Sequence, residues 1–137
     1  MWRGIMTYNI NDKEFIESDL YKSFISANPG FGFLKIRAYA ASQAVPISSM
    51  NVTVSKNIGG NKVIFFSGVT NESGVIERIQ LPVPRLSDNT TVPIITTYDI
   101  DTSYEDESRF YEVNVYDNIY VVQNINVTPN ISYGGTL

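Results

Sequence analysis

Residues Gln43–Val54 read QAVPISSMNVTV, a proline-bearing loop that runs into a strand of alternating apolar and polar residues. The alternation predicts that Met50, Val52 and Val54 face the interior, while the residues between them face solvent. A second segment, GVTNESG at Gly68–Gly74, ends the next strand in a polar turn that glycine closes. Together the two segments are typical of a small β-sandwich.

The same period of two continues on both sides of this centre. From Phe31 onward, apolar residues at even positions alternate with an outward row formed by Phe33, Lys35, Arg37 and Tyr39. Asn57–Asn61 supplies turn residues that tolerate positive φ, so it predicts a hairpin. Further strands are predicted at residues 62–66, 75–81, 94–100, 110–116 and 119–127, with a tight turn at Asp117–Asn118 before the last of them.

Proline limits the remaining segment. Pro82, Pro84 and Pro93 lack the donor that a strand ladder needs, so the loop that they bracket, through residues 88–90, is no central strand. The whole pattern predicts a mainly β fold, an antiparallel sandwich of about seven strands with a short N-terminal α-helix.

That helix is expected at Asn11–Ala27. Asn11 and Glu14 have the spacing of a capping box, and Pro29 with Gly30 ends the helix. Apolar residues recur at four-residue spacing at Ile16, Leu20 and Phe24. This stripe packs against the sandwich in one interpretation and docks a partner subunit in the other. The expected organisation is an N-terminal extension over residues 1–30, a β-sandwich domain over 31–129 and a C-terminal tail over 130–137.

The composition excludes several kinds of chemistry. The chain of 137 residues has neither cysteine nor histidine. The usual zinc ligands, a cysteine nucleophile and the commonest general base near neutral pH are therefore missing. We expect no catalysis and no cofactor. The formal net charge of −4 disfavours nucleic acid as a partner, because an acidic surface repels phosphate.

The sequence also lacks the patterns that direct a chain to a membrane. Met1–Met6 carries one cation, but no apolar run follows it, so it does not match a signal peptide. No stretch approaches the roughly 18 apolar residues of a membrane helix. We expect the protein to be made in the cytoplasm and to reach its final place in a virion, a spore or another cell-surface assembly.

Three motifs together resemble one domain family. A proline loop precedes a Val-x-Val strand at Val52–Val54, a polar turn ending in glycine stands at Thr70–Gly74, and a strand motif with tyrosine stands at Tyr98–Ile100. In this order they are similar to the motifs of the carboxypeptidase-regulatory-like domain, a transthyretin-like (prealbumin-like) β-sandwich. The resemblance implies that fold and implies no catalytic residue.

A narrower resemblance joins two further segments. LPVPRLS at Leu81–Ser87 and VYDN at Val115–Asn118, followed by VQNI and a proline within 122–129, look like a subgroup from spore-forming Firmicutes. That subgroup includes a module of clostridial spore cortex-lytic enzymes and phage-borne relatives. The family's glycine and alanine before the Val-x-Val strand are Ser49 and Met50 here, which suggests altered packing. Its turn aspartate is Asn71, whose amide keeps an acceptor, so we expect the turn to survive.

An acidic segment offers oxygen ligands. Its members near a predicted strand end are Asp99, Asp101, Glu105, Asp106 and Glu107. The first three are the candidate ligands for Ca²⁺, a cation that prefers oxygen. The spacing matches no EF-hand loop and no glycine makes the sharp turn, so we prefer a solvated acidic loop without a metal.

Aromatic residues crowd the last third of the chain. Tyr111, Tyr116 and Tyr120 are the predicted binding residues, because exposed tyrosines stack on sugar rings or anchor protein interfaces. Ordinary cross-strand pairing within one sheet is the alternative.

Two functions remain open at this stage. The first is a non-catalytic structural or interaction subunit of a larger assembly, which docks through its termini and sandwich edges onto protein partners or further copies of itself. The second is a peptidoglycan- or carbohydrate-binding accessory module that works beside a lytic enzyme.

Overall fold

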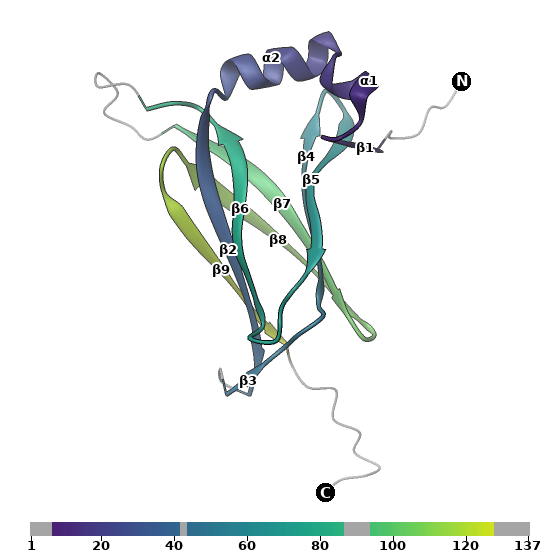
Figure 1. The fold of residues 1–137 in the computed structure, drawn as a ribbon, viewed down its shortest axis with the longest axis vertical. Helices are drawn as coiled ribbons and strands as arrows, with labels where there is room; N and C mark the ends of the chain where they lie inside the picture. Colours follow the sequence, from purple (N-terminus) through teal and green to yellow (C-terminus); the bar gives the residue numbers. More distant parts are fainter. Residues whose placement is uncertain (1–6, 42–43, 87–93, 128–137) are drawn as a thin grey trace, which may run out of the picture.

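The computed structural model describes residues 7–41, 44–86 and 94–127. Within these residues the chain forms two helices and nine strands (Figure 1). Their order is β1 (Thr7–Asn9), α1 (Lys13–Ile16), α2 (Asp19–Ala27), β2 (Gly30–Ala40), β3 (Val45–Pro46), β4 (Asn51–Ile58), β5 (Asn61–Val69), β6 (Val75–Val83), β7 (Ile95–Tyr104), β8 (Glu107–Tyr116) and β9 (Tyr120–Val127). The predicted tail over 130–137 and the loop at 88–90 lie outside the described residues.

The mainly β prediction is confirmed, but the predicted number of strands is wrong. The structure has nine strands among the described residues instead of about seven. The two additional strands are β1, with three residues, and β3, with two. Neither is long enough to show an alternating pattern in the sequence, so only their pairing partners in the fold reveal them.

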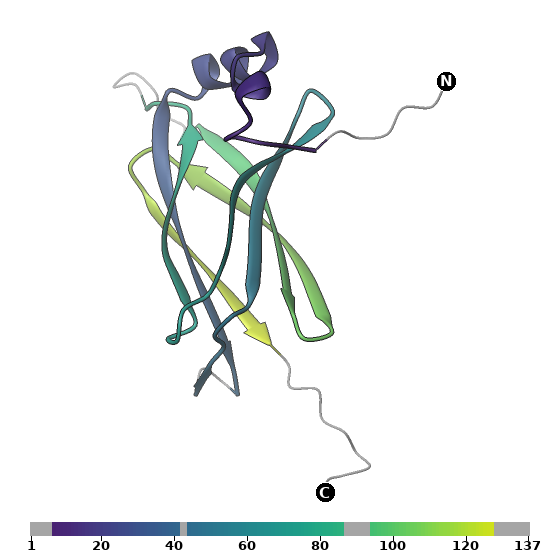
Figure 2. The same cartoon turned by 45° about the vertical axis from the view of Figure 1, so that its right-hand side comes forward.

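The strands form two sheets that face each other (Figures 1 and 2). The A sheet has the order β1-β5-β4-β7-β8, and in the B sheet the central strand β2 pairs with β3, β6 and β9. The prediction of a wholly antiparallel sandwich is wrong, because β1 pairs with β5 and β9 pairs with β2 in parallel. The turn at Asp117–Asn118 carries the chain from the A sheet to the B sheet instead of closing a hairpin, and β9 then runs in the direction of β2.

The core lies between the sheets and follows the predicted alternation. Met50, Val52 and Val54 are each at most 1% exposed, and the even-numbered residues of β2 are buried as well. Tyr98 of β7 is fully buried, and its hydroxyl donates a hydrogen bond to the carbonyl of Pro82. Pro82 is accommodated because β6 is an edge strand, where a missing donor breaks no ladder.

The predicted turn before Gly74 and the predicted hairpin turn at Asn57–Asn61 both form. The side chain of Asn71 accepts hydrogen bonds from the backbone N–H groups of Ser73 at 2.9 Å and Val75 at 3.0 Å. The expected amide-centred turn is therefore confirmed. Gly59 and Gly60 have φ values of 61° and 83° in the hairpin between β4 and β5, where residues with a Cβ are strained.

The prediction of one continuous helix over Asn11–Ala27 is wrong. α1 ends after a single turn, and Ser18 begins α2 by accepting a hydrogen bond from the N–H of Tyr21 at 3.3 Å. The capping box does not form either, because Asp12 occupies the cap position of α1 and its side chain makes no capping bond. Ser18 interrupts the predicted helix because its hydroxyl also donates to the carbonyl of Phe15 at 2.5 Å. This bond ends α1 at the point where α2 begins.

Both helices lie across one end of the sandwich (Figure 1). A continuous series of aromatic contacts ties them to the core, with successive ring centroids 4.7 to 6.4 Å apart. We call this series the aromatic chain; its members are Tyr8, Phe15, Tyr21, Phe24, Phe65 and Tyr98. Phe15 is its most buried helical member, at 4% exposed, and stands outside the predicted stripe.

Candidate binding face

The outer surface of the B sheet carries an aromatic platform. In the strand register Phe33 of β2 lies between Tyr120 of β9 and Gln80 of β6. The rings of Phe33 and Tyr120 stack with centroids 5.2 Å apart. The guanidinium of Arg78 lies 4.3 Å from the centroid of the Phe33 ring, a cation–π arrangement. The three side chains together present flat π-faces and fixed hydrogen-bond donors.

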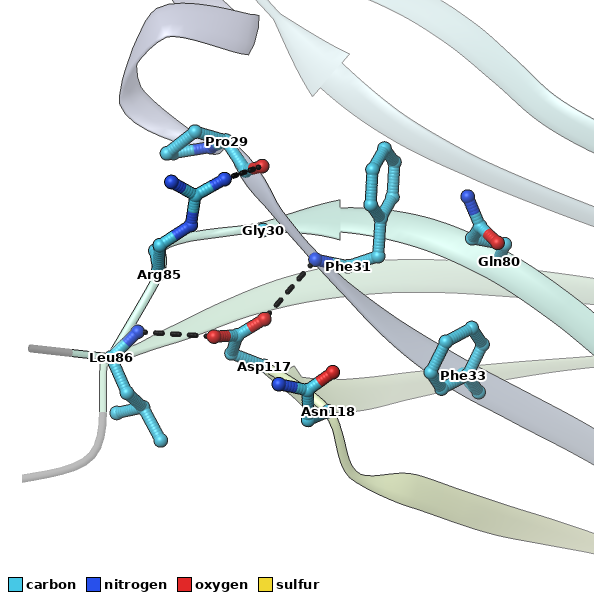
Figure 3. Close-up of a pocket in the computed structure, with 9 residues that line it drawn as sticks. All are labelled: Pro29, Gly30, Phe31, Phe33, Gln80, Arg85, Leu86, Asp117 and Asn118. Atoms are coloured by element: carbon cyan, nitrogen blue, oxygen red, sulfur yellow. Dashed lines mark hydrogen bonds between the residues drawn. The ribbon is translucent and has the colours of Figure 1, made fainter.

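A hollow of about 500 Å³ opens beside this platform (Figure 3). It lies where the start of β2, the residues after β6 and the turn before β9 meet. The side chains that line it and carry the argument are Phe31, Phe33, Gln80, Arg85, Leu86 and Asn118. The hollow therefore combines an apolar floor with two amides and a guanidinium.

Asp117 holds the rim of the hollow together. Asp117 is 8% exposed, and its carboxylate accepts hydrogen bonds from the backbone N–H groups of Phe31 and Leu86, each at 3.2 Å (Figure 3). Arg85 donates to the carbonyl of Pro29 at 3.1 Å. These bonds tie three segments that are remote in sequence, and they orient the surrounding side chains before any ligand arrives.

The crossing of the chain between the sheets brings the platform together. The N–H of Asn118 donates to the carbonyl of Phe31 at 2.8 Å, and the N–H of Phe33 donates to the carbonyl of Ile119 at 3.0 Å. Gly32 lies against the carbonyl of Tyr116, where a Cβ would have no room. The close approach of β2 to the end of β8 thus requires glycine at this position.

The chemistry of the face is suited to binding. Exposed rings offer apolar area, amides donate and accept, and guanidinium groups donate to oxygen or carry charge. The large apolar side chains around the hollow are between 44% and 52% exposed: Phe31, Leu86, Ile119, Tyr120 and Val122. Exposed apolar side chains gathered in one region mark candidate interaction sites.

The structure separates the three predicted binding tyrosines. Tyr120 belongs to the platform and is 52% exposed. Tyr111 lies on the inward row of β8 and packs against the core. Tyr116 is half-buried at the end of the same strand, on the row that faces outward. The alternation of β8 places Tyr111 on the same side as Val113, and the binding role of the three tyrosines stays a prediction.

Part of the predicted docking stripe packs against the sandwich of the same chain. Phe24 packs on Phe65 with centroids 5.8 Å apart, and Leu20 lies over the backbone of Gly59. Ile16 and Leu20 are still 37% and 38% exposed. Docking of a partner on this exposed portion stays a prediction.

The acidic segment is not a loop over its whole length. Asp99 and Asp101 lie inside β7, on the outer surface of the A sheet, while Glu105 lies in the turn to β8. Within residues 7–41, 44–86 and 94–127, no group of three metal-ligating side chains is placed to hold an ion. Asp99 and Asp101 instead border a second hollow of about 310 Å³ with Lys62 and Phe110.

The pKa of Asp99 is raised above its ordinary value. Burial is the largest cause, and the nearby carboxylates of Glu112 and Asp101 raise it further, while Lys56 and Lys62 act in the opposite direction. Asp99 and Glu112 are direct partners in the register of β7 and β8, so two like charges face each other across the strands.

Sequence reasoning missed the residues at the centre of the face. Phe31, Phe33 and Arg78 were not among the predicted binding residues. The outward row of β2, which starts with Phe33 and continues through Lys35, was visible as a signal. The part that this row plays in a binding face was not visible, because the register that places Tyr120 and Arg78 beside Phe33 belongs to the tertiary structure.

The fold is a two-sheet β-sandwich, and the face is an aromatic, cation-bearing candidate binding surface. A solved structure of transthyretin from Sparus aurata is similar to this chain at 14% sequence identity, with 69% of this chain and 90% of that chain covered and a TM-score of 0.42. No protein-family model and no curated protein sequence matches the chain. The sandwich rests on the strand pairing itself, and the carboxypeptidase-regulatory-like family with its spore cortex-lytic subgroup stays a prediction.

No helix in the described part of the chain is long and apolar enough to cross a bilayer.

Proposed function

We propose that the protein is a non-catalytic interaction subunit of a larger assembly, a virion or a spore or cell-surface particle. The observation that carries the proposal is the apolar surface around the hollow, where Phe31, Tyr120 and Val122 are each about half exposed. Aromatic side chains beside arginine are the commonest anchors of protein interfaces. Phe31 lies in β2, and Tyr120 and Val122 lie in β9, while Asp117 accepts hydrogen bonds from Phe31 and from Leu86 beside them.

This proposal places the docking surface on the outer side of the B sheet and not where the sequence predicted it. The sequence pointed to the termini and the sheet edges, and the termini lie outside the described residues. β8 and β9 remain edge strands with one unpaired side among the described residues. The outer surface of the B sheet adds exposed Phe31, Tyr120 and Val122, so we place the principal contact there.

Incorporation into particles tests the proposal. Tagged wild-type chain and the variant Phe31→Ser/Tyr120→Ser are expressed in the producing cells, and extracts are sedimented through a density gradient. We expect wild type in the fast-sedimenting fractions and the variant to be depleted there at least about ten-fold, as the loss of about 1.4 kcal/mol implies. Val45→Ser is the matched control, because Val45 is also 48% exposed but lies at β3, away from the hollow.

Equal sedimentation of wild type and the double variant would contradict this placement. A wild-type chain that never leaves the slow fractions would contradict the assembly role itself.

The platform also favours a second candidate, a peptidoglycan- or carbohydrate-binding accessory module. A stacked pair such as Phe33 and Tyr120 beside Gln80 and Asn118 offers a ring face and amide partners for hydroxyl groups. Co-sedimentation with purified insoluble peptidoglycan tests this candidate. Binding that Tyr120→Ala weakens about ten-fold supports it, and an absence of bound protein contradicts it.

A further inference from the structure

The two outer surfaces of the sandwich carry opposite charge. On the strands of the B sheet, the outward charged residues are three cations and one carboxylate: Lys35, Arg37, Arg78 and Glu77. On the strands of the A sheet, they are three carboxylates and one lysine: Asp99, Asp101, Glu112 and Lys62. We call these surfaces the basic face and the acidic face. They lie on opposite sides of the molecule, because each is the outside of one of two packed sheets (Figure 2).

Each face holds one internal ion pair and two further charges. Lys35 lies 3.7 Å from Glu77 on the basic face, and Lys62 lies 3.6 Å from Asp101 on the acidic face. The remaining charges are Arg37 and Arg78 on one side and Asp99 and Glu112 on the other. Among the ion pairs of the described residues, none includes any of these four. The excess charge is therefore two cations against two carboxylates.

Carboxylates repel one another on the acidic face of an isolated chain, and Lys56 and Lys62 offset part of that repulsion at Asp99. Asp99 and Glu112 are like charges in register, and such pairs destabilise a sheet. The raised pKa of Asp99 has the same origin in part. A cation brought from outside would relieve this repulsion, and the adjoining Phe110, 58% exposed, offers apolar area to whatever brings it.

The basic face supplies the matching groups. The guanidinium of Arg78 is fixed over Phe33, and that of Arg37 lies 6.0 Å from the ring of Tyr39. Guanidinium groups held by stacking are well suited to bind carboxylates, because little of their freedom remains to be lost. At the Arg78 end of the basic face Phe33 stacks on exposed Tyr120, and on the acidic face exposed Phe110 lines the second hollow with Asp99 and Asp101.

From this complementarity we infer that the basic face of one copy of the chain docks on the acidic face of a second copy. The inference rests on the proposed assembly role and names the chain itself as a partner. Two basic faces would repel each other, and so would two acidic faces, so the contact is heterologous. Such a contact leaves one face free at each end and continues into a ring or an open filament.

Light scattering across protein concentration tests the inference. At low salt we expect the molar mass of the wild-type chain to rise above 15.4 kDa as concentration increases. In 1 M salt, where the Debye length is about 3 Å, we expect association to weaken by at least about ten-fold. Wild type that stays monomeric at low salt overturns self-docking, while the gradient experiment above still decides the proposed function.

Charge-reversed variants identify the two faces. Arg37→Glu/Arg78→Glu destroys the basic face, and Asp99→Lys/Glu112→Lys destroys the acidic face. Each variant alone should remain monomeric, with its fold verified by circular dichroism. Their equimolar mixture should associate again, because the intact acidic face of one variant meets the intact basic face of the other, and the two reversed faces are complementary to each other as well.

The equimolar mixture of the two variants distinguishes a heterologous contact from other kinds of contact. A mixture that stays monomeric, or variants that associate alone like wild type, would overturn the inference. Exposed charges on the helices and in a turn provide controls with the same changes in net charge: Lys13→Glu/Lys22→Glu and Glu17→Lys/Glu72→Lys. Both control proteins should associate as wild type does.

Discussion

Residues in left-handed backbone positions set the turns of this sandwich. Ser49 has φ 61° immediately before the strand β4, and Gly74 has φ 75° before β6. A residue with a Cβ is strained in this region, and glycine is not. Ser49 carries a Cβ, so its conformation stores backbone strain. Met50, the next residue, is buried at 1% exposed and packs in the core.

Exchange at these two positions should have opposite effects on stability. Ser49→Gly relieves the strained conformation and should raise the free energy of unfolding by about 0.5 kcal/mol, after the entropy cost of glycine. Gly74→Ala should lower it by more than about 1 kcal/mol, because the new Cβ would also press on the carbonyl of Ala38. Urea unfolding measures both, and a destabilised Ser49→Gly would show that this serine is not strained.

The charge of Asp99 should make stability depend on pH. Its pKa in the folded state is raised above the ordinary value of 3.8, so the folded chain binds this proton more readily than the unfolded chain. The contribution of Asp99 to the free energy of unfolding is therefore most favourable at pH values below its pKa in the unfolded chain. That contribution is lost as the pH rises through its pKa in the folded chain. At pH 7 the full penalty of the charged carboxylate remains.

Asp99→Asn removes this penalty. We expect a higher Tm than wild type at pH 7 and an equal Tm near pH 3, where wild-type Asp99 is protonated too. Glu72→Gln, at an exposed turn position, should change Tm little at either pH. A lower Tm for Asp99→Asn at pH 7 would mean that the carboxylate makes a favourable contact that outweighs its burial.

At the scale of elements, the helix pair depends on one aromatic residue. Phe15 is 4% exposed, stacks on Tyr8 with ring centroids 4.7 Å apart and packs at a tilt against Tyr21 with centroids 5.3 Å apart. α2 itself has no buried residue, although Phe24 contacts the core. The helices are therefore held by the aromatic chain more than by the stripe at Ile16 and Leu20.

Alanine substitutions should reveal this order. Phe15→Ala should cost about 3–5 kcal/mol, since a buried ring leaves a cavity. Leu20→Ala, 38% exposed over Gly59, should cost less than about 2 kcal/mol, and Ile16→Ala should stay within about 0.5 kcal/mol. Denaturant unfolding gives all three values. A larger loss for Leu20→Ala than for Phe15→Ala would reverse the assignment.

At the scale of the whole molecule, helices and sheets share one core. Phe65 of β5 contacts Phe24 of α2 on one side and Tyr98 of β7 on the other, so the aromatic chain joins helix to sandwich. A single core in a chain of this size favours all-or-none unfolding. The basic face and the acidic face, by contrast, lie on separate outer surfaces and carry charge of opposite sign.

Thermal unfolding should accordingly be one cooperative transition. Far-ultraviolet circular dichroism, which detects helix and sheet, and tyrosine fluorescence, which detects packing, should have the same midpoint. Helical signal that is lost at a lower temperature than the fluorescence change would show that α1 and α2 unfold independently of the sandwich.

Much of the sandwich could be predicted because alternation is local. The rows through Val52 in β4 and Leu34 in β2 are buried as their spacing predicts, and the turn at Asn71 forms from its own side chain. The helix boundary was not predicted, because Ser18 competes with Asn11 as a cap and only the packing of Phe15 favours a break between them.

The candidate binding face depended on long-range pairing. Periodicity along one strand shows that Phe33 and Tyr120 point outward, but their stacking requires β9 to lie parallel to β2. That arrangement follows from the crossing at Asp117, whose carboxylate bonds to Phe31 and Leu86 across the fold. Composition and period therefore established a β-sandwich without histidine or cysteine chemistry. Tertiary structure alone decided which side chains share a surface and which charge each surface carries, because register joins residues that no local pattern connects.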